Sequence, residues 1–209
     1  MNKGLAHFFS GAFHPLLIPT LLFAFLFTFY PQAAYNLTFQ GQVYFVGVIF
    51  VTTFLLPGLA IMMLRTSNTI SSVLMERREE RIIPFIIITL VYFIIAYMFA
   101  FYRSFNTLVS AVVIGMALIS LLLTIITFFF KISVHAATIS GVIGFALGTQ
   151  LHYAVEGNFV YIVSLLVLFA GLVSSSRLSL DAHKPNEILA GIIVGFSVSL
   201  ISVLLFLNP

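Results

Sequence analysis

Cysteine and tryptophan are absent from this 209-residue sequence, and charged residues make up only 7% of it. The absence of cysteine excludes a disulfide framework, a thiol nucleophile and a thiolate metal site. The scarcity of charge is more informative, because a soluble domain carries about 25% charged residues. Nine Lys and Arg with six Asp and Glu cannot cover a globule of 23.1 kDa, so the composition excludes a water-soluble monomer.

Apolar residues dominate instead. Hydrophobic residues make up 61% of the sequence, phenylalanine alone occurs 24 times, and the mean hydropathy is +1.18. This composition is typical of an integral membrane protein and excludes a disordered chain. The net charge of +3 is small and scattered along the chain, which argues against a nucleic-acid partner. The bilayer is therefore the expected environment.

Seven apolar stretches are candidate membrane spans, since a spanning helix needs about 20 residues. They lie at roughly 13–30, 43–64, 82–102, 107–130, 136–152, 159–175 and 186–207. The fifth and sixth are short, and demoting either would leave six spans. We therefore expect one all-α domain over residues 1–209, a polytopic transmembrane helix bundle with about seven spans. Pro57 and Gly58 are expected to kink the second span.

The polar stretch 65–81 separates the second and third spans. Ile70, Val73 and Leu74 recur in it at helical spacing, which predicts a short helix in the membrane interface. With seven spans, Arg103 is the only cation expected on the side opposite the N-terminus. The cations on the N-terminal side are Lys3, Arg65, Arg77, Arg78, Arg81, Lys131, Arg177 and Lys184. The positive-inside rule then predicts that the N-terminal side is cytoplasmic.

Three clusters of ionisable residues lie beside the spans, where such residues indicate a functional site. The first cluster is residues 76–81, the second is residues 131–135, and the third is residues 176–187. Two spans separate the first cluster from the second, and two separate the second from the third. Even numbers of crossings bring all three clusters to one membrane face, which is the condition for a shared site.

The third cluster has the pattern S-R-x5-H-x3-E, and the second contains S-x-H. Together they resemble the motifs of the type 2 phosphatidic acid phosphatase superfamily, a family of membrane lipid phosphatases. That family carries K-x6-R-P, then P-S-G-H, then S-R-x5-H-x3-D. Ser176, Arg177 and His183 match the last motif, with Glu187 where the family has Asp.

The other two motifs are matched less fully. Ser133 and His135 match the middle motif, while Ile132 and Val134 stand where the family has Pro and Gly. In the first motif Arg81 is not directly followed by proline, and the matching lysine is absent. Two apolar segments also separate this arginine from the middle motif, whereas the family keeps its first two motifs near one loop.

The resemblance implies a hydrolase of lipid phosphates that works through a phosphohistidine and requires no metal or other cofactor. It implies that His183 attacks phosphorus, that Glu187 orients it, and that His135 protonates the leaving group. It implies that the phosphate is held by Arg177, Ser133 and one or more of Arg77, Arg78 and Arg81.

Two physical features of the sequence agree with an anion site at this face. The third, fifth and seventh spans all begin there, so their N-termini direct unpaired N–H groups and positive dipole ends toward it. The fifth span also carries Gly144 and Gly148, and the seventh carries Gly191 and Gly195, at the spacing that allows close helix packing. If these two spans touch, His135 and His183 come near each other.

Several candidates also have plainer interpretations. Ser133 could be only a helix N-cap, and Glu187 only a carboxylate at a helix N-terminus. His14 could line the same site, although a snorkelling interfacial histidine is the simpler interpretation.

The three arginines of the first cluster could be a cytoplasmic stop signal beside a membrane helix. On a helix, however, the first cluster would place Arg77 over Arg81 and Glu76 over Glu80, and such like-charge pairs are unfavourable. An arginine face that meets an anion would explain that arrangement.

We therefore expect a membrane-embedded lipid phosphatase that hydrolyses a phosphate monoester or pyrophosphate and is entered from the bilayer. One alternative is a catalytically inactive relative that binds lipid headgroups or serves as a subunit of a membrane complex. A second alternative is a small transporter in which Pro57 and Gly58 break a helix.

Overall fold

The computed structural model describes residues 1–35, 37–101, 106–153 and 159–207, and in this part of the chain every regular element is helical. The all-α bundle expected from the sequence is therefore confirmed. The helices are α1 (Lys3–Ala12), α2 (Ile18–Phe29), α3 (Phe39–Phe50), α4 (Leu56–Thr66), α5 (Ile82–Phe101), α6 (Thr107–Thr127), α7 (Val134–Tyr153), α8 (Phe159–Ser179) and α9 (Pro185–Leu207). Shorter elements are the 3-10 turns η1 (Pro31–Ala34) and η3 (Glu79–Arg81) and the π-helical turn η2 (Val51–Leu55).

Within the described ranges, six helices are long and apolar enough to cross a membrane. They are Phe39–Thr66, Glu79–Ala100, Thr107–Thr127, Val134–Tyr153, Phe159–Ser179 and Pro185–Leu207. The chain is thus a multi-pass membrane protein by helix length and composition. The six-span alternative is confirmed, but the short element is the first expected span rather than the fifth or sixth.

Prolines explain why the first expected span is short. α2 has 12 residues, or about 18 Å, against a hydrocarbon core of about 30 Å. Pro19 lies in its first turn, where a missing N–H costs nothing. The helix ends at Phe29, and Tyr30, which precedes Pro31, has left the helical conformation with φ −128° and ψ 81°. α1 forms a separate helix that buries Ala6 and Ser10.

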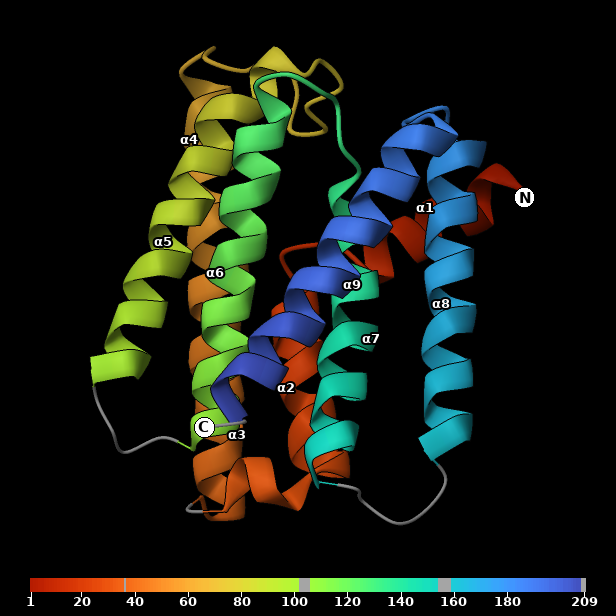
Figure 1. Cartoon of the computed structure of the whole chain (residues 1–209). Helices are drawn as coiled ribbons and strands as arrows, with labels where there is room; N and C mark the ends of the chain where they lie inside the picture. Colours follow the sequence, from red (N-terminus) through yellow and green to blue (C-terminus); the bar gives the residue numbers. More distant parts are fainter. Residues whose placement is uncertain (36, 102–105, 154–158, 208–209) are drawn as a thin grey trace.

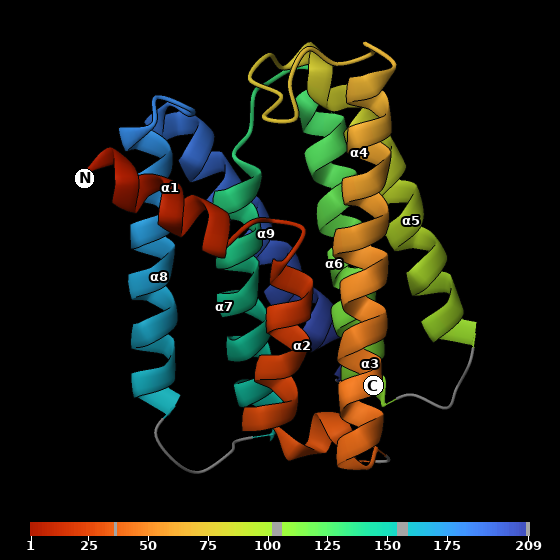
Figure 2. The same cartoon turned by 180° about the vertical axis from the view of Figure 1, so that it is seen from behind.

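Figures 1 and 2 show how the helices are arranged. α2, α7 and α9 form the centre, α4, α5 and α6 stand on one side, and α8 stands on the other. α1 crosses α8 toward one end of the bundle (Figure 2), and the two helices are in contact. The core lies around α2, α6 and α7, where Phe23, Val112 and Phe145 are almost fully buried.

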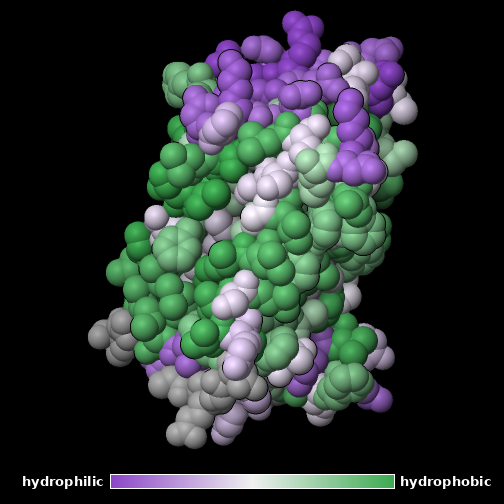
Figure 3. All heavy atoms as spheres, turned by 90° about the vertical axis from the view of Figure 1, so that its right-hand side faces the viewer, coloured by the Kyte–Doolittle hydropathy of each residue, from purple (hydrophilic) through white to green (hydrophobic). Residues whose placement is uncertain are grey.

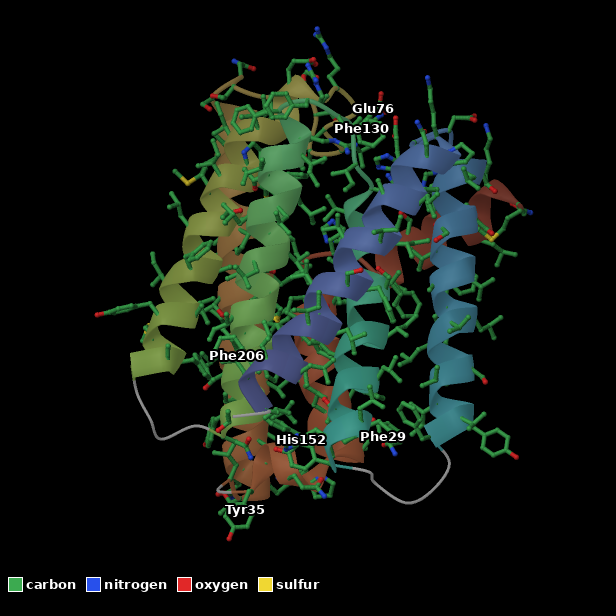
Figure 4. All side chains as sticks on the ribbon, in the orientation of Figure 1. Phe29, Tyr35, Glu76, Phe130, His152 and Phe206 are labelled. Atoms are coloured by element: carbon green, nitrogen blue, oxygen red, sulfur yellow. The ribbon has the colours of Figure 1, made fainter. Side chains whose placement is uncertain are left out.

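The three polar clusters lie at the same end of the bundle, as the even spacing of the spans predicts. The connections α4–α5, α6–α7 and α8–α9 all lie at the upper end of Figure 1. Hydrophilic side chains gather at this end in Figure 3, above a largely apolar body. Glu76 lies at this end and His152 near the other (Figure 4). We call the end that carries the clusters the polar end.

The predicted interfacial helix within 65–81 is wrong. α4 ends at Thr66, and Asn68 then adopts a left-handed φ of 58°, which closes the helix with bonds from Asn68 N to Arg65 O and from Thr69 N to Leu64 O. Turns and bends follow, and of the three apolar residues only Ile70 is buried. The first cluster therefore does not stack like charges on a regular helix.

The second expected span does not break at Pro57. It runs without interruption from Phe39 to Thr66, and a π-helical turn over Val51–Leu55 precedes the proline. Such a turn is one way for a helix to accommodate a residue that has no N–H. The broken helix that a transporter interpretation needs is therefore not present.

α7 and α9 approach each other at the level of their backbones. A Cβ atom added to Gly195 would overlap the carbonyl oxygen of Ala137, and one added to Gly191 would overlap that of Ser133. Gly144 of α7 faces the carbonyl oxygen of Phe196 in the same way. The close contact expected from the glycine spacing is therefore confirmed, and both helices begin at the polar end.

This contact predicts a difference between two glycines. Gly195→Ala should lower the free energy of unfolding by about 1–3 kcal/mol, the usual cost of overpacking. Gly171→Ala on α8 is the matched control, because no atom lies within 4 Å of its added Cβ. Thermal unfolding of the purified variants in detergent measures both. Equal melting temperatures for the two variants would contradict the close contact.

Candidate functional site

His183 and Glu187 form a buried pair at the start of α9. Glu187 is the third residue of the helix, and its Oε2 accepts a hydrogen bond from His183 Nδ1 at 2.6 Å and from Lys184 N at 3.3 Å. Pro185 occupies the first helical position, where it is well tolerated. Glu187 therefore both caps the helix and orients the histidine, so the two interpretations made for it from the sequence are compatible.

The turn between α8 and α9 places His183 beside the end of α8. Asp181 adopts a left-handed φ of 52°, and the amides of Asp181 and Ala182 bond to the carbonyl groups of Leu178 and Arg177. This is the Schellman arrangement, which reverses the chain directly after a helix. Arg177, in the last turn of α8, and His183, just before α9, are thereby held at the same end of the bundle.

The protonation state of His183 follows from its surroundings. Burial lowers the pKa of His183, the hydrogen bond to Glu187 opposes this shift, and Arg81 and Arg177 act with burial. The imidazole is therefore neutral at neutral pH. Since Nδ1 bears the hydrogen that Glu187 accepts, Nε2 carries a free lone pair. Among the described residues, Nε2 makes no hydrogen bond.

Hydrogen bonds to and from its backbone join the second cluster to the other two. Ser133 caps α7, with its Oγ 3.5 Å from Ala136 N, and its own N–H donates to the carbonyl oxygen of Glu187 at 3.1 Å. Arg81 donates from Nε to Met75 O at 2.8 Å and from Nη1 to Ile132 O at 3.3 Å. The structure therefore brings parts of all three clusters together.

His135 and Arg177 meet at a residue that the sequence analysis did not consider. Ser10 of α1 accepts a hydrogen bond from Arg177 Nη1 through Oγ at 2.5 Å, and its carbonyl oxygen lies 3.2 Å from His135 Nε2. The Oγ atom also lies 3.4 Å from the same nitrogen. Because a carbonyl oxygen can only accept, Nε2 of His135 carries a hydrogen. Nothing in the residues around Ser10 distinguishes it by sequence alone.

His14 also lies at this site. Its ring centroid is 5.8 Å from that of His135, and the two rings are nearly perpendicular. Burial, and next the charge of Arg177, lowers the pKa of His14. These contacts favour the alternative in which His14 lines the site. A histidine before Pro15 was the only sequence signal for it.

The site is electropositive. In the part of the chain that the structure describes, the ion pairs are Arg78 with Glu79 and His183 with Glu187. Arg81 is 6% exposed and Arg177 is partly buried, and neither forms an ion pair there. The Nε atom of Arg177 is buried and has no hydrogen-bond partner among these residues. Cations that are buried or partly buried and have no ion-pair partner are costly, so this arrangement favours an anionic ligand.

Two of the predicted phosphate-binding residues are not brought into this arrangement. Arg77 is exposed, and Arg78 is half-buried and lies 3.4 Å from the exposed Glu79. Arg81 is brought in, but its guanidinium already donates to two carbonyl groups. Ser133 is fully buried. Arg177 is therefore the best placed of the predicted phosphate-binding residues.

An apolar cavity adjoins the site inside the bundle. It is lined by α2, α5, α6 and α7, and its lining includes Leu16, Val134 and Thr138, which are close in sequence to His14 and His135. Along α7 it extends from Val134 to Phe145, about 16 Å at the helical rise. That length is about half of a hydrocarbon core of about 30 Å.

Comparison with family models, curated proteins and solved structures finds no match to this chain. No group of three or more His, Cys, Asp or Glu able to hold a metal ion occurs within the described ranges.

The contacts of Arg81 predict that it supports the fold of the loop at the polar end. Arg81→Ala should lower the free energy of unfolding by about 1–3 kcal/mol, because two carbonyl groups lose their donor. Arg77→Ala is the matched control, since the exposed Arg77 should change stability by less than about 0.5 kcal/mol. Thermal unfolding compares the two, and equal effects would count against the buried contacts of Arg81.

Proposed function

We propose that this protein is a membrane-embedded lipid phosphatase that hydrolyses a phosphate monoester or pyrophosphate of a lipid. The observation that carries this proposal is the 2.6 Å hydrogen bond from His183 Nδ1 to Glu187, beside the unpaired cations Arg177 and Arg81. A carboxylate that holds Nδ1–H leaves Nε2 free as a nucleophile, and nearby cations can stabilise the charge on a phosphoryl group.

In the proposed reaction Nε2 of His183 attacks phosphorus, so that a P–N bond forms as the P–O bond to the lipid breaks. Glu187 stabilises the positive imidazole that results. The leaving oxygen takes a proton from His135 in its doubly protonated imidazolium form, which leaves His135 neutral. Water then attacks phosphorus and releases inorganic phosphate, and the electrons of the P–N bond return to His183. His135 accepts the proton of this water, so both histidines recover their starting state.

Arg177 is the proposed main phosphate ligand, through donors that Ser10 does not use. Ser133, Arg81, Arg77 and Arg78 stay candidates for further contacts, as the motif resemblance implies. His135 must release Ser10 before it can act as an acid, because its Nε2–H now points to the carbonyl oxygen of Ser10.

The apolar cavity supports a lipid as the substrate. Its walls begin next to His14 and His135, so an anionic headgroup at the site would have its chain in the membrane interior. A water-soluble phosphate would gain nothing from such a cavity. Candidate substrates are phosphatidate, phosphatidylglycerophosphate and polyprenyl pyrophosphate.

One observation favours the alternative of a headgroup-binding relative or a subunit of a membrane complex. Ser10 engages both Arg177 and His135, so the proposed acid is not free in this state. A protein that binds anionic headgroups without turning them over would keep these contacts unchanged.

The proposed nucleophile predicts the effect of His183→Asn. Asn can still donate from Nδ2 to Glu187, so the fold should survive, but it has no nucleophilic nitrogen at the Nε2 position. Release of phosphate from phosphatidate should fall by at least about 10³-fold. His7→Ala is the control, because His7 is exposed on α1. Inorganic phosphate is measured after reconstitution of each variant into lipid vesicles.

Two outcomes would overturn this proposal. Full activity of His183→Asn would exclude the nucleophile. Absence of phosphate release by the unaltered protein, from lipid monoesters and pyrophosphates alike, would leave the headgroup-binding alternative.

We also propose that the polar end faces the cytoplasm. Lys3, Arg65 and Lys184 are exposed there, whereas the one cation expected at the other end, Arg103, lies outside the described residues. Exposed cations that hold no ligand are the ones to which the positive-inside rule applies.

Cysteine labelling tests this orientation, and the absence of native cysteine makes the signal specific. In intact cells a membrane-impermeant maleimide should label Gln32→Cys, at the opposite end, but not Ser67→Cys. Both should react after lysis. Labelling of Ser67→Cys in intact cells would place the polar end outside.

A further inference from the structure

The N-terminal segment is anchored directly at the candidate site. Ser10 contacts both Arg177 and His135, and Phe13 packs against Phe169 of α8 with ring centroids 4.9 Å apart. The chain then turns, with a hydrogen bond from His14 N to Gly11 O, before α2 begins. These contacts hold the residues after α1 against α7 and α8.

The hydrogen-bond pattern fixes the tautomer of His14. Its Nδ1 accepts a hydrogen bond from Leu16 N at 3.3 Å, so the hydrogen of the neutral ring is on Nε2. Nε2–H has no hydrogen-bond partner among the described residues. The ring lies edge-to-face with His135 on one side and with Phe54 on another, at centroid distances of 5.8 Å and 6.4 Å. A partly buried donor without a partner therefore stands next to the proposed acid.

We propose that His14 is a further substrate-binding residue of this site, which donates a hydrogen bond from Nε2 to the phosphate of the lipid headgroup. This inference rests on the proposed function for the identity of the ligand, an anionic lipid phosphate.

The chemistry of the surrounding groups supports a neutral donor at this position. Arg177 already supplies a positive charge, and a second charge on His14 would be repelled by it, as the lowered pKa of His14 indicates. A neutral Nε2–H can contact a phosphate oxygen without that penalty. Together with the unpartnered Nε–H of Arg177, it gives the site two donors that no described residue uses.

His14 also has a structural contact, the bond from Leu16 N, and two substitutions separate the two roles. His14→Asn keeps an acceptor for the amide two residues on, as in an Asx turn, but loses the distant donor. His14→Gln reaches as far as Nε2 and keeps a donor, but does not reproduce the Nδ1 acceptor. A purely structural role predicts that Asn is tolerated and Gln is not, and the proposed role predicts the reverse. His7→Asn on the exposed face of α1 is the matched control.

The test uses the purified full chain in detergent and needs no turnover. Dioctanoyl phosphatidate is titrated, and the rise in melting temperature gives its dissociation constant, with dioctanoylglycerol as the headgroup control. His14→Asn should raise the dissociation constant for phosphatidate about 10–100-fold, the worth of a hydrogen bond to a charged group. His14→Gln should change it by less than about 3-fold, and His7→Asn should leave it unchanged.

If the unaltered protein is active, the KM for phosphatidate should rise in His14→Asn and change little in His14→Gln and His7→Asn. Unchanged phosphatidate binding by His14→Asn would overturn the proposal, as would an equal loss in the Asn and Gln variants. If phosphatidate binding depends on His14 but no phosphate is released, the role of His14 is supported and the proposed hydrolysis is wrong. No difference between phosphatidate and dioctanoylglycerol for the unaltered protein would refute the anion site itself.

Discussion

The close approach of α7 and α9 is the constraint on which the rest of the molecule depends. Within lipid the hydrophobic effect does not drive helices together, so they associate through van der Waals contact and interhelical hydrogen bonds. Gly191 and Gly195 allow that contact at the level of the backbone, and both helices begin at the same end. One result is the bond from Ser133 N to the carbonyl oxygen of Glu187, which fixes the start of one helix against the start of the other. Bulky residues at these glycines would separate the starts of α7 and α9, and with them His135 and His183.

The candidate site at the polar end has more positive than negative charge, because few acidic side chains are buried there. Glu187 is buried and already hydrogen-bonded to His183, and its negative charge also acts on Arg81. Arg81 is stabilised by carbonyl dipoles instead of a carboxylate, and Arg177 by a serine hydroxyl. Neutral acceptors satisfy the geometry of a guanidinium but do not cancel its charge. The bundle therefore holds a local excess of positive charge where the surrounding chain is mainly apolar. The attraction between these cations and an anion would be stronger here than the same attraction in water, because the dielectric constant is lower.

Much of this arrangement could be predicted from the sequence, because it depends on regular helices. The apolar lengths predict the long spans, and the spacing of Gly191 and Gly195 predicts the helix contact. The pairing of His183 with Glu187 was expected only from the motif resemblance, and the rules for helix N-termini explain how it forms across Pro185. The position of Ser10 and His14 could not be predicted, because α1 is placed by tertiary contacts with helices far away in the sequence. The loop after α4 was also mispredicted, since the left-handed conformation of Asn68 ends the helical pattern despite the apolar spacing beyond it.

The contact between Ser10 and Arg177 joins residues that are 167 positions apart in the sequence. α1 is made before α7 and α8 on the ribosome, so the groups that hold it appear only later. Until α7 and α8 are inserted, the amphipathic helix α1 can bury its apolar side chains only in the membrane surface. Leu5 and Phe8 are among these side chains, and both are still exposed in the folded protein. Assembly of the site must therefore follow insertion of most of the chain, so the order of biosynthesis prevents a partly inserted protein from having a complete site.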